Sequence, residues 1–559
     1  MQNKYLIHKL FLGAISLLAL GSCKKKIDDA YLNPNAPLVV PVETILPGVL
    51  GGFTAFNAAA GSNYGVQADD VVLGRYIQYW GSTTNNENYG EMGGTIGSDV
   101  TGAMWGAAYY GHGQNVNRII QWGSEQQKWD FVGVGYAVRA WDWLELTNQY
   151  GDAILKEAFN VNLIQFHYDT QPEFYDSCRA NCMNALNYLN RTDGNVNNAN
   201  LAQSDAYFNG GSIDKWKKFV YGILARSYND LSSKGIYLSN HYVDSAIKYA
   251  SLSCSSNADN ILATFSALNT SNGFNSYWGP TRSNIGSIRQ GGYIANLMSG
   301  ANTTAFNGVS DPRTWYMLSE NSLGTFKGVT PWLGVTEYGG VTPTPTYPRN
   351  FWRSGAPNAT TGTDDSTRYV YGNKGPWPMM TAAEMQFTLA EAAYRKGDLV
   401  TAYAAYKNGI SLDFDMLTTT FSFNIPVIPV NHVITPAMKA AYMANTNVVP
   451  ATSAGLTLTH IMLQKYIALY GWGTHQTWTD MRKFHYVDKD PVTSKQVYAD
   501  FTPPPTSPIN YLVSTNNGKY VYRCRPRFNS EYIYDIPELT RIGALSADYI
   551  TNECWFSMP

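Results

Sequence analysis

Apolar residues recur at helical spacing most clearly in the segment 381–412. Met385 and Leu389 lie four residues apart on one stripe, as they do in an amphipathic helix that buries one face. Gly397 stands where such a helix ends, and Asp398 stands where the next helix is capped. The segment therefore predicts two antiparallel helices joined by a tight turn. Because such a pair cannot bury both of its faces alone, neighbouring helices must pack against it.

The charged residues of this pair invite a catalytic interpretation, but their positions favour a structural one. Glu384, Glu391, Arg395 and Asp398 stand near the ends of the predicted helices or three to four residues apart along one helix. Acidic residues stabilise helix N-termini, and opposite charges at this spacing meet on a helix surface. We interpret the four residues as caps and as pairs along the helix faces.

The same periodicity predicts helices on both sides of the pair. The predicted helical segments are 42–50, 66–80, 105–122, 129–150, 174–189, 216–231, 241–252 and 457–484. Between 258 and 380, Gly, Asn, Thr, Ser and Pro dominate, and helical spacing returns only near 293–298. A long irregular stretch inside a compact domain is typical of a functional region. The pattern predicts a mainly α-helical domain with a scaffold at 42–257 and 381–484, an irregular binding region at 258–380, and a loop-rich segment at 485–559.

The start of the chain predicts export to a membrane surface. Basic residues precede an apolar run at 10–20, which is shorter than the roughly 20 residues that span a bilayer. The run ends in Leu20-Gly21-Ser22-Cys23, which resembles the lipobox of bacterial lipoproteins. We therefore expect residues 1–22 to be a signal peptide and Cys23 to carry the lipid anchor. The alternative is an ordinary secretory signal followed by a chance cysteine.

The composition of the chain excludes several further classes of function and of binding site. The formal net charge is −2, so no global field recruits nucleic acid or anionic lipid. Charged residues make up only 15% of the chain, whereas aromatic residues reach 14%, with 40 Tyr and 15 Trp. The five cysteines after Cys23 show no regular spacing, which argues against a disulfide framework or a zinc site. We expect Cys178 and Cys182, four residues apart in a predicted helix, to be buried as small apolar side chains.

Several motifs, taken in order, resemble those of the SusD/RagB family of outer-membrane, nutrient-binding lipoproteins. Their order and spacing over nearly the full chain carry the resemblance, since no single motif is specific. Ala153-Ile154 depart from the family's β-branched residue and proline, and Asn529 departs from a common proline. The matching segments are Cys23 with Asn33-Pro34-Asn35, Tyr150-Gly151-Asp152 with Glu157-Ala158, Glu384 to Asp398, Gln464 to Leu469 with Gly473, Trp478, Asp480 and Arg482, and Arg525 to Asn529 with Glu531-Tyr532.

The resemblance implies a fold of tetratricopeptide-like helical pairs, with an irregular region packed on one side that holds the binding site. It implies a non-catalytic lipoprotein of the outer membrane, facing the cell exterior. Such a protein captures an oligo- or polysaccharide and delivers it to a partner, a SusC-like TonB-dependent transporter. No cofactor is implied. Because some members of the family handle peptides, a peptide cargo is an alternative.

An enzyme would need a catalytic constellation, and the sequence offers none of the common ones. No G-x-S-x-G elbow, H-E-x-x-H helix or phosphate-binding Gly-Lys loop is present, and the eight histidines lack ligand spacing. A glycosidase needs two facing carboxylates, for which Asp364-Asp365 and Asp413 with Asp415 are the candidates. Acids this close in sequence are more often solvated or helix caps, so neither pair is positive evidence for an enzyme. A surface glycoside hydrolase is therefore the less favoured alternative. Asp364 and Asp365 supply only part of the ligand pattern of a calcium site.

Sugar binding needs flat aromatic platforms with polar groups at their edges. Exposed loop aromatics meet this need better than aromatics at helical spacing, which belong to the core. The alternative for each is a ring folded back over the helical layer. We predict three ligand-binding clusters in loops: Tyr79 with Trp80, Tyr277 with Trp278 and Arg282, and Trp352 with Arg353.

Overall fold

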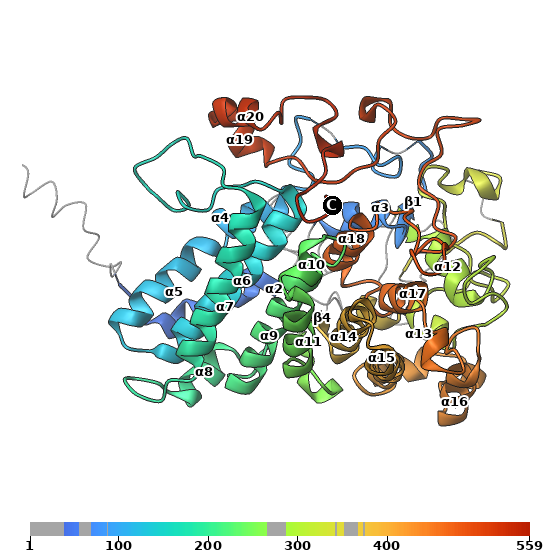
Figure 1. Cartoon of the computed structure of the whole chain (residues 1–559), viewed down its shortest axis with the longest axis horizontal. Helices are drawn as coiled ribbons and strands as arrows, with labels where there is room; N and C mark the ends of the chain where they lie inside the picture. Colours follow the sequence, from blue (N-terminus) through green and yellow to red (C-terminus); the bar gives the residue numbers. More distant parts are fainter. Residues whose placement is uncertain are drawn as a thin grey trace, which may run out of the picture.

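The structure is a computed structural model that describes residues 39–54, 69–86, 88–94, 96–264, 287–340, 344–351, 367–372 and 375–559. The described chain is mainly α-helical, as predicted (Figure 1). Its first helices are α2 (Leu46–Thr54), α3 (Asp70–Tyr76), α4 (Ala103–Tyr109), α5 (Gly113–Glu125), α6 (Trp129–Tyr150), α7 (Gln171–Leu189), α8 (Asn198–Ser204), α9 (Ile213–Asn229), α10 (Ile236–Ser239) and α11 (Tyr242–Leu252). The later helices are α12 (Gly292–Ser299), α13 (Thr314–Met317), α14 (Ala382–Lys396), α15 (Leu399–Thr419), α16 (Pro436–Ala444), α17 (Leu458–Ala468), α18 (Thr474–Arg482), α19 (Phe528–Tyr534) and α20 (Ile536–Arg541).

Short strands and turns complete the described elements. The strands are β1 (Trp80–Ser82), β2 (Ile261–Ala263), β3 (Ile288–Gln290) and β4 (Trp377–Met380). The 3₁₀ turns are η1 (Val42–Thr44), η2 (Asn257–Asp259), η3 (Val335–Tyr338), η4 (Tyr369–Tyr371), η5 (Ser422–Val427), η6 (Val430–His432), η7 (Ser453–Gly455), η8 (Ser514–Asn516) and η9 (Tyr549–Thr551).

The long helices pack as successive antiparallel pairs. Helix α6 packs along α7, α9 along α11, and α14 along α15, and each pair contacts the next through α7 with α9 and α11 with α14. In Figure 1 this series runs from α5 at the left to α17 at the right. In the same view the segments around α12 and α13 lie at the right end of the series, beside α17, and the C-terminal segment with α19 and α20 lies along the top.

The predicted helix pair at 381–412 is confirmed, and its ends show why it forms. The hydroxyl of Thr381 accepts a hydrogen bond from the backbone N–H of Glu384 at 3.2 Å, which caps α14. Gly397 ends α14 with φ +87°, a left-handed conformation that glycine adopts without strain. Asp398 then accepts a hydrogen bond from the N–H of Thr401 at 3.0 Å and caps α15. Helices α11 and α17 cover the faces that the pair cannot bury itself.

Glu384 and Glu391 differ from their interpretation as caps and surface pairs. Both side chains are fully buried. Glu384 accepts a hydrogen bond from Nε of Arg226 at 2.7 Å, and Glu391 lies 2.9 Å from Nζ of Lys483. Their partners come from α9 and from the end of α18, so the carboxylates join helices that are far apart in the sequence. A buried charge needs such a partner, but helical spacing alone cannot identify it.

Two predicted long helices are each divided into two. The segment 105–122 contains the break between α4 and α5, where a side chain at Gly113 would come within 1.7 Å of the backbone oxygen of Ala108. The segment 457–484 contains the break between α17 and α18, where Gly471 has φ +87°. In both places the apolar periodicity continues across the break, because both helices of each pair face the same core.

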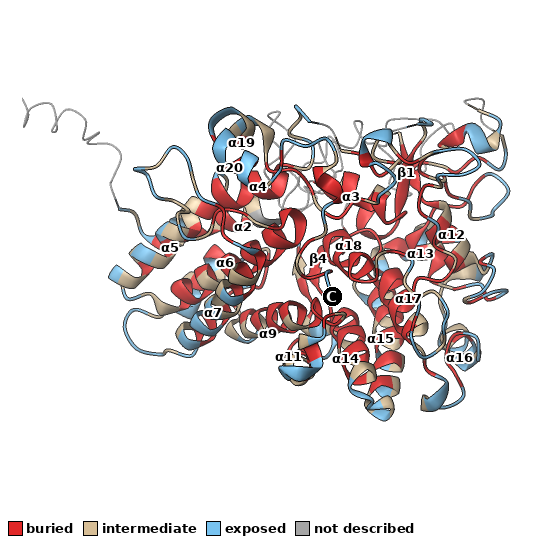
Figure 2. Ribbon diagram, turned by 45° about the horizontal axis from the view of Figure 1, so that its top comes forward, coloured by how far each residue is buried: buried red, intermediate tan, exposed pale blue. Residues whose placement is uncertain are grey.

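The described part of the irregular region contains strands of two small antiparallel sheets, and the first sheet joins this region to the scaffold. Strand β1 pairs with β3, and β2 pairs with β4, which leads directly into α14. One hydrophobic core contains residues from both parts, including Tyr293 and Trp377 from the irregular region. Figure 2 shows the result: buried residues fill the centre of the molecule, and exposed residues cover the outer sides of the peripheral helices. Cys178 and Cys182 are buried, as predicted.

Candidate functional site

The structure corrects the prediction that Tyr79 and Trp80 form an exposed sugar platform. The side chain of Tyr79 has 0% exposure and that of Trp80 has 1%. The hydroxyl of Tyr79 donates a hydrogen bond to the backbone oxygen of Tyr466 at 2.6 Å, and Nε1 of Trp80 donates one to the backbone oxygen of Val71 at 2.9 Å. A Cβ at Gly74 would lie 2.2 Å from the Trp80 ring, so the ring rests directly on helix α3.

The pairing of β1 with β3 explains this burial. It draws the chain after α3 towards the irregular region and turns the Trp80 ring back over the helix. The two rings therefore stabilise the contact between scaffold and irregular region, and neither is accessible to a sugar in this structure. This is the folded-back arrangement that the sequence left open as an alternative.

The other predicted site residues lie outside the described residues. They are Tyr277, Trp278, Arg282, Trp352 and Arg353, and the same holds for the lipidation site Cys23. Their roles stay predictions. The candidate calcium ligands Asp364 and Asp365 also lie outside the described residues.

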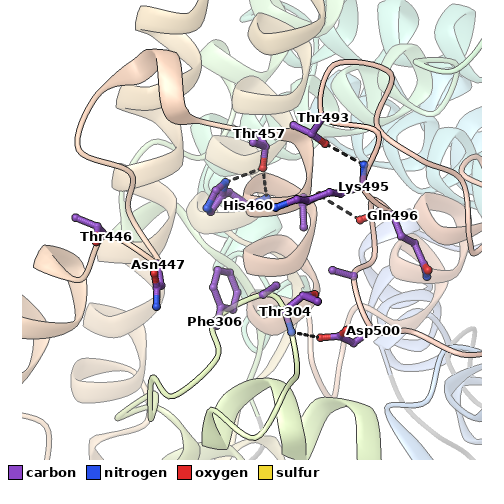
Figure 3. A pocket seen from close by; sticks show the side chains of 13 residues that line it. Thr304, Phe306, Thr446, Asn447, Thr457, His460, Thr493, Lys495, Gln496 and Asp500 are labelled. Carbon is purple, nitrogen blue, oxygen red and sulfur yellow. Dashed lines mark hydrogen bonds between the residues drawn. The ribbon is translucent and has the colours of Figure 1, made fainter.

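Among the described residues, a cavity of about 570 Å³ is the best candidate for a binding site (Figure 3). Four segments meet around it: the loop after α12, the connection after α16, the first turn of α17, and the loop 493–500. Its described lining is rich in hydroxyl and amide groups and includes the ring of Phe306 and the imidazole of His460: Thr304, Phe306, Thr446, Asn447, Thr457, Thr459, His460, Thr493, Lys495, Gln496 and Asp500.

His460 is the polar centre of this cavity. Its backbone N–H donates to the hydroxyl of the capping residue Thr457 at 3.3 Å, and its Nδ1 lies 2.7 Å from the same hydroxyl. Two aromatic rings lie near the imidazole, with the centroid of Phe306 at 6.4 Å and that of Tyr406 at 6.3 Å. Burial, and secondarily the positive charge of Lys495, lowers the pKa of His460 to about 4. The imidazole is therefore neutral at physiological pH and can both donate and accept hydrogen bonds.

Among the described residues, Asp500 is the only carboxylate that lines the cavity, and other groups of the protein already engage it. Asp500 accepts hydrogen bonds from the backbone N–H of Thr303 at 2.9 Å, from the hydroxyl of Thr303 at 2.7 Å, and from the N–H of Thr304 at 2.8 Å. Figure 3 shows its contact with Thr304 at the lower edge of the cavity. Gln496 likewise donates to the backbone oxygens of Tyr498 and Phe501. These two side chains brace the loops that shape the cavity.

Other side chains at the rim remain available to a ligand. Asn447, Thr446 and Lys495 are exposed, and Asn447 and Lys495 approach the opening from opposite sides in Figure 3. Neutral hydroxyl, amide and imidazole groups around an apolar floor can bind a polyhydroxylated ligand. They are poorly suited to glycoside hydrolysis, which needs two carboxylates on either side of the scissile bond.

The other acidic pair considered from the sequence has a structural role. Asp413 is fully buried, and its Oδ2 accepts a hydrogen bond from Nη1 of Arg313 at 2.7 Å. Arg313 is also paired with Asp311 at 2.6 Å. Asp415 lies at the surface and pairs with Lys439 at 2.6 Å. Both aspartates of this pair are thus engaged by basic side chains of the protein.

Sequence reasoning missed this cavity because its lining residues are separated by nearly 200 positions. Thr457 marks the start of a helix in the sequence, and this is the only signal near the site. The spacing of histidines along the chain can indicate a metal site, but it cannot reveal a single neutral imidazole near two aromatic rings.

The comparisons with known proteins agree with the fold. Residues 52–499 match the SusD-like family described as "Starch-binding associating with outer membrane". No curated protein matches the chain. A solved structure of a SusD/RagB family protein from Bacteroides thetaiotaomicron has 18% sequence identity and a TM-score of 0.66, covering 93% of this chain and 99% of that one.

Two further solved structures are named for a ligand. A chitin-binding protein has 18% identity and a TM-score of 0.66, covering 93% of this chain and 100% of that one. A chitin-binding SusD homolog from Flavobacterium johnsoniae has 17% identity and a TM-score of 0.60, covering 92% of this chain and 98% of that one. At these identities the likeness shows a shared fold. Because the family match extends over most of the sequence, the chain belongs to the SusD-like family.

Proposed function

We propose that this protein binds an oligo- or polysaccharide at the bacterial surface and delivers it, unmodified, to a SusC-like TonB-dependent transporter. The observation that carries the proposal is the family match over residues 52–499, since the family's description combines starch binding with the outer membrane. The two structural neighbours named as chitin-binding support a carbohydrate as the ligand class. A glycan is therefore favoured over a peptide.

Two surfaces are proposed to contact the glycan. The first consists of Tyr277, Trp278, Arg282, Trp352 and Arg353, whose rings and guanidinium groups suit the apolar faces and hydroxyl edges of sugars. The second is the cavity around His460. Its volume of about 570 Å³ and its mostly neutral hydroxyl and amide lining are suited to one or two sugar rings.

Binding without catalysis is supported by the state of the carboxylates. Asp500 accepts three hydrogen bonds from Thr303 and Thr304, and Asp413 is buried against Arg313. A general acid must release a proton at the glycosidic oxygen, and the base or nucleophile must face it across the sugar. Neither aspartate is free to take such a role.

The anchor is proposed to be a lipid on Cys23. In the described part of the chain, no helix has the length and apolar character needed to cross a bilayer. Two or more acyl chains anchor a protein stably, because each buried CH₂ contributes about 0.8 kcal/mol. Mass spectrometry of the protein purified from membranes tests this directly. We expect a mature chain that begins at Cys23 and carries acyl groups.

The proposed function is tested by affinity electrophoresis of the full chain in detergent, with soluble glycans such as starch and glycol chitin in the gel. We expect retarded migration in at least one glycan, with no smaller sugars released on prolonged incubation. Release of smaller sugars would show a hydrolase. Binding to oligopeptides but to none of the glycans would overturn the carbohydrate assignment.

A further inference from the structure

A further cavity, also of about 570 Å³, lies among the first long helices of the scaffold, and we call it the α6–α7 cavity. Its walls come from α5, α6, α7 and the loop 155–159 between α6 and α7. In Figures 1 and 2 these helices lie at the left of the molecule, whereas α12, α16 and α17 lie at the right. The α6–α7 cavity and the His460 cavity share no described lining residue, so they are separate places for a ligand.

Arg139 is a positive charge at the wall of the α6–α7 cavity, with only 8% exposure. No described carboxylate forms an ion pair with it, and Asp142, one helical turn further on, is paired with His112 at 2.9 Å. Burial lowers the pKa of Arg139 to about 10, so the guanidinium stays charged at neutral pH.

One nitrogen of this guanidinium is available to a ligand. Nη2 donates a hydrogen bond to the backbone oxygen of Gly113 at 3.1 Å, and Nε is closed off from solvent. Nη1 makes no hydrogen bond to a described residue, but it is not among the buried atoms that lack a partner, so it keeps accessible surface. It can therefore donate to a group inside the cavity.

An apolar wall lies beside the guanidinium. Cζ of Arg139 lies 5.1 Å from the ring centroid of Trp143 and 4.8 Å from that of Phe159. Phe159 has φ +66°, a left-handed conformation that a bulky residue adopts only at a cost in free energy. Its half-buried ring and the side chain of Leu155 line the cavity. An apolar surface with a hydrogen-bond donor at its edge suits the face of a sugar ring.

Amide groups from α5 and α7 supply further hydrogen-bonding positions. The half-buried side chain of Asn117 makes no hydrogen bond to a described residue, so its amide can both donate and accept. Asn181 donates through Nδ2 to the backbone oxygen of Ser177 at 2.7 Å, which leaves its Oδ1 as an acceptor. Both amides line the cavity together with the hydroxyl group of Ser177.

The charges around the cavity favour a neutral ligand over an anion. Glu173 and Asp176 line it, and the side chain of Asp176 is 81% exposed. Glu173 is paired with Lys156. Two carboxylates would repel an anion that approached Arg139. Sugar hydroxyls instead can donate to the carboxylates and accept from the guanidinium, because each hydroxyl has both capacities.

We propose that the α6–α7 cavity is an additional saccharide-binding site, which takes about one or two neutral sugar rings of the glycan. The apolar face of a sugar lies against Phe159 and Leu155, and its hydroxyls bond to Nη1 of Arg139 and to Asn117. This inference rests on the proposed function, since it takes a glycan as the ligand. A polysaccharide long enough to occupy this cavity and the proposed binding region together is released more slowly than one held at a single place.

Hydrogen exchange of the full chain in detergent, followed by mass spectrometry of its peptides, tests the proposal. The neutral probes are maltohexaose and chitohexaose, fragments of starch and chitin, and the anionic probe is hexagalacturonic acid. We expect a neutral probe near its Kd to slow exchange in the loop 155–159 about twofold, because bound sugar suppresses local opening. The anionic probe should slow it less.

The outcomes separate this site from the proposed function. Slower exchange only in other segments would overturn the additional site and leave the proposed function standing. If no probe slows exchange anywhere and no glycan retards the protein in affinity electrophoresis, both are wrong. A larger effect of hexagalacturonic acid on the loop would overturn the assignment of a neutral ligand.

Variants test the named contacts. Asn117→Ala removes an amide that holds no described residue, so the melting temperature should stay unchanged while affinity at this cavity falls roughly two- to tenfold. Phe159→Gly removes the ring and relieves the left-handed backbone, and it should weaken binding as well. Asn187→Ala, exposed on α7 and not lining the cavity, is the matched control. If the loop is slowed as fully in both folded variants as in the control, the proposal is wrong.

Discussion

Lys483 and Glu391 form an ion pair inside the scaffold, with 2.9 Å between Nζ and Oε1 and 0% exposure of both side chains. Glu391 also accepts hydrogen bonds from the amide of Asn229 and the hydroxyl of Ser232, both at 2.7 Å. The carboxylate therefore links α14, the end of α18, and the turn that follows α9. The buried pair therefore holds the turn after α9 against α14.

Replacing Glu391 with Ala should strongly destabilise the fold. Lys483 and the two neutral donors would lose their acceptor, although Lys483 keeps Asp480 at 3.0 Å. Breaking a buried pair by removing one partner typically costs about 3–5 kcal/mol. Urea unfolding followed by tryptophan fluorescence measures the loss. Asp244→Ala is the control, because it breaks an exposed pair with Lys396 and should cost less than about 1 kcal/mol. Equal losses in the two variants would contradict a special role for the buried pair.

The same carboxylate predicts a dependence of stability on acid pH. Burial alone would raise the pKa of Glu391, but Lys483, Lys465 and Arg395 lower it from 4.5 to about 2. Below pH 4.5 the unfolded chain therefore binds a proton that the folded chain still excludes. The stability that Glu391 contributes is complete above pH 4.5 and is lost as the pH falls towards 2.

Urea titrations between pH 5 and pH 3 would check this expectation. The free energy of unfolding of the unaltered protein should fall steeply over this range, and that of Glu391→Gln should fall less. Parallel curves for the two proteins would show that other carboxylates account for the acid sensitivity.

How far the sequence predicts this structure depends on whether a feature is local. Helix α6 begins and ends at the predicted residues, and Gly397 and Asp398 mark the turn between α14 and α15, because periodicity and caps act over a few residues. The partners of Glu384 and Glu391 come from distant helices, and no local pattern identifies them. Trp80 illustrates the same limit, since its burial follows from pairing with a strand over 200 residues later. The His460 cavity depends on loops that meet only in the folded chain.

Trp80→Ala should reduce stability and should not act as a binding variant. The ring is 1% exposed and packs against Gly74 and edge-on to Phe351, with 6.2 Å between the centroids of the two aromatic rings. Removing a buried tryptophan typically costs about 3–5 kcal/mol through lost contacts and the cavity left behind. Thermal unfolding measures the effect. If Trp80→Ala has the melting temperature of the unaltered protein but loses glycan binding, Trp80 contacts the ligand and our assignment to the core is wrong.

Trp278→Ala should behave in the opposite way. Its place in a Gly- and Asn-rich loop, beside Tyr277 and Arg282, predicts an exposed ring that stacks on a sugar. We expect weaker retention in affinity electrophoresis and an unchanged melting temperature. If Trp278→Ala lowers the melting temperature as much as Trp80→Ala does, both rings belong to the core and the proposed aromatic site is wrong.

Asn447→Ala tests whether the His460 cavity takes part in glycan binding. The side chain is exposed at the rim, so its removal should leave the melting temperature unchanged. A hydrogen bond between neutral groups typically contributes about 0.5–1.5 kcal/mol, which corresponds to roughly a two- to tenfold loss of affinity in calorimetric titration with the retained glycan. Asn190→Ala, at the exposed end of α7, is the matched control and should bind normally.

If Asn447→Ala also binds normally while Trp278→Ala does not, the glycan lies on the aromatic loops alone. If both lose affinity, the sugar chain contacts both surfaces, and the affinity of a series of longer oligosaccharides should rise until the chain spans the two.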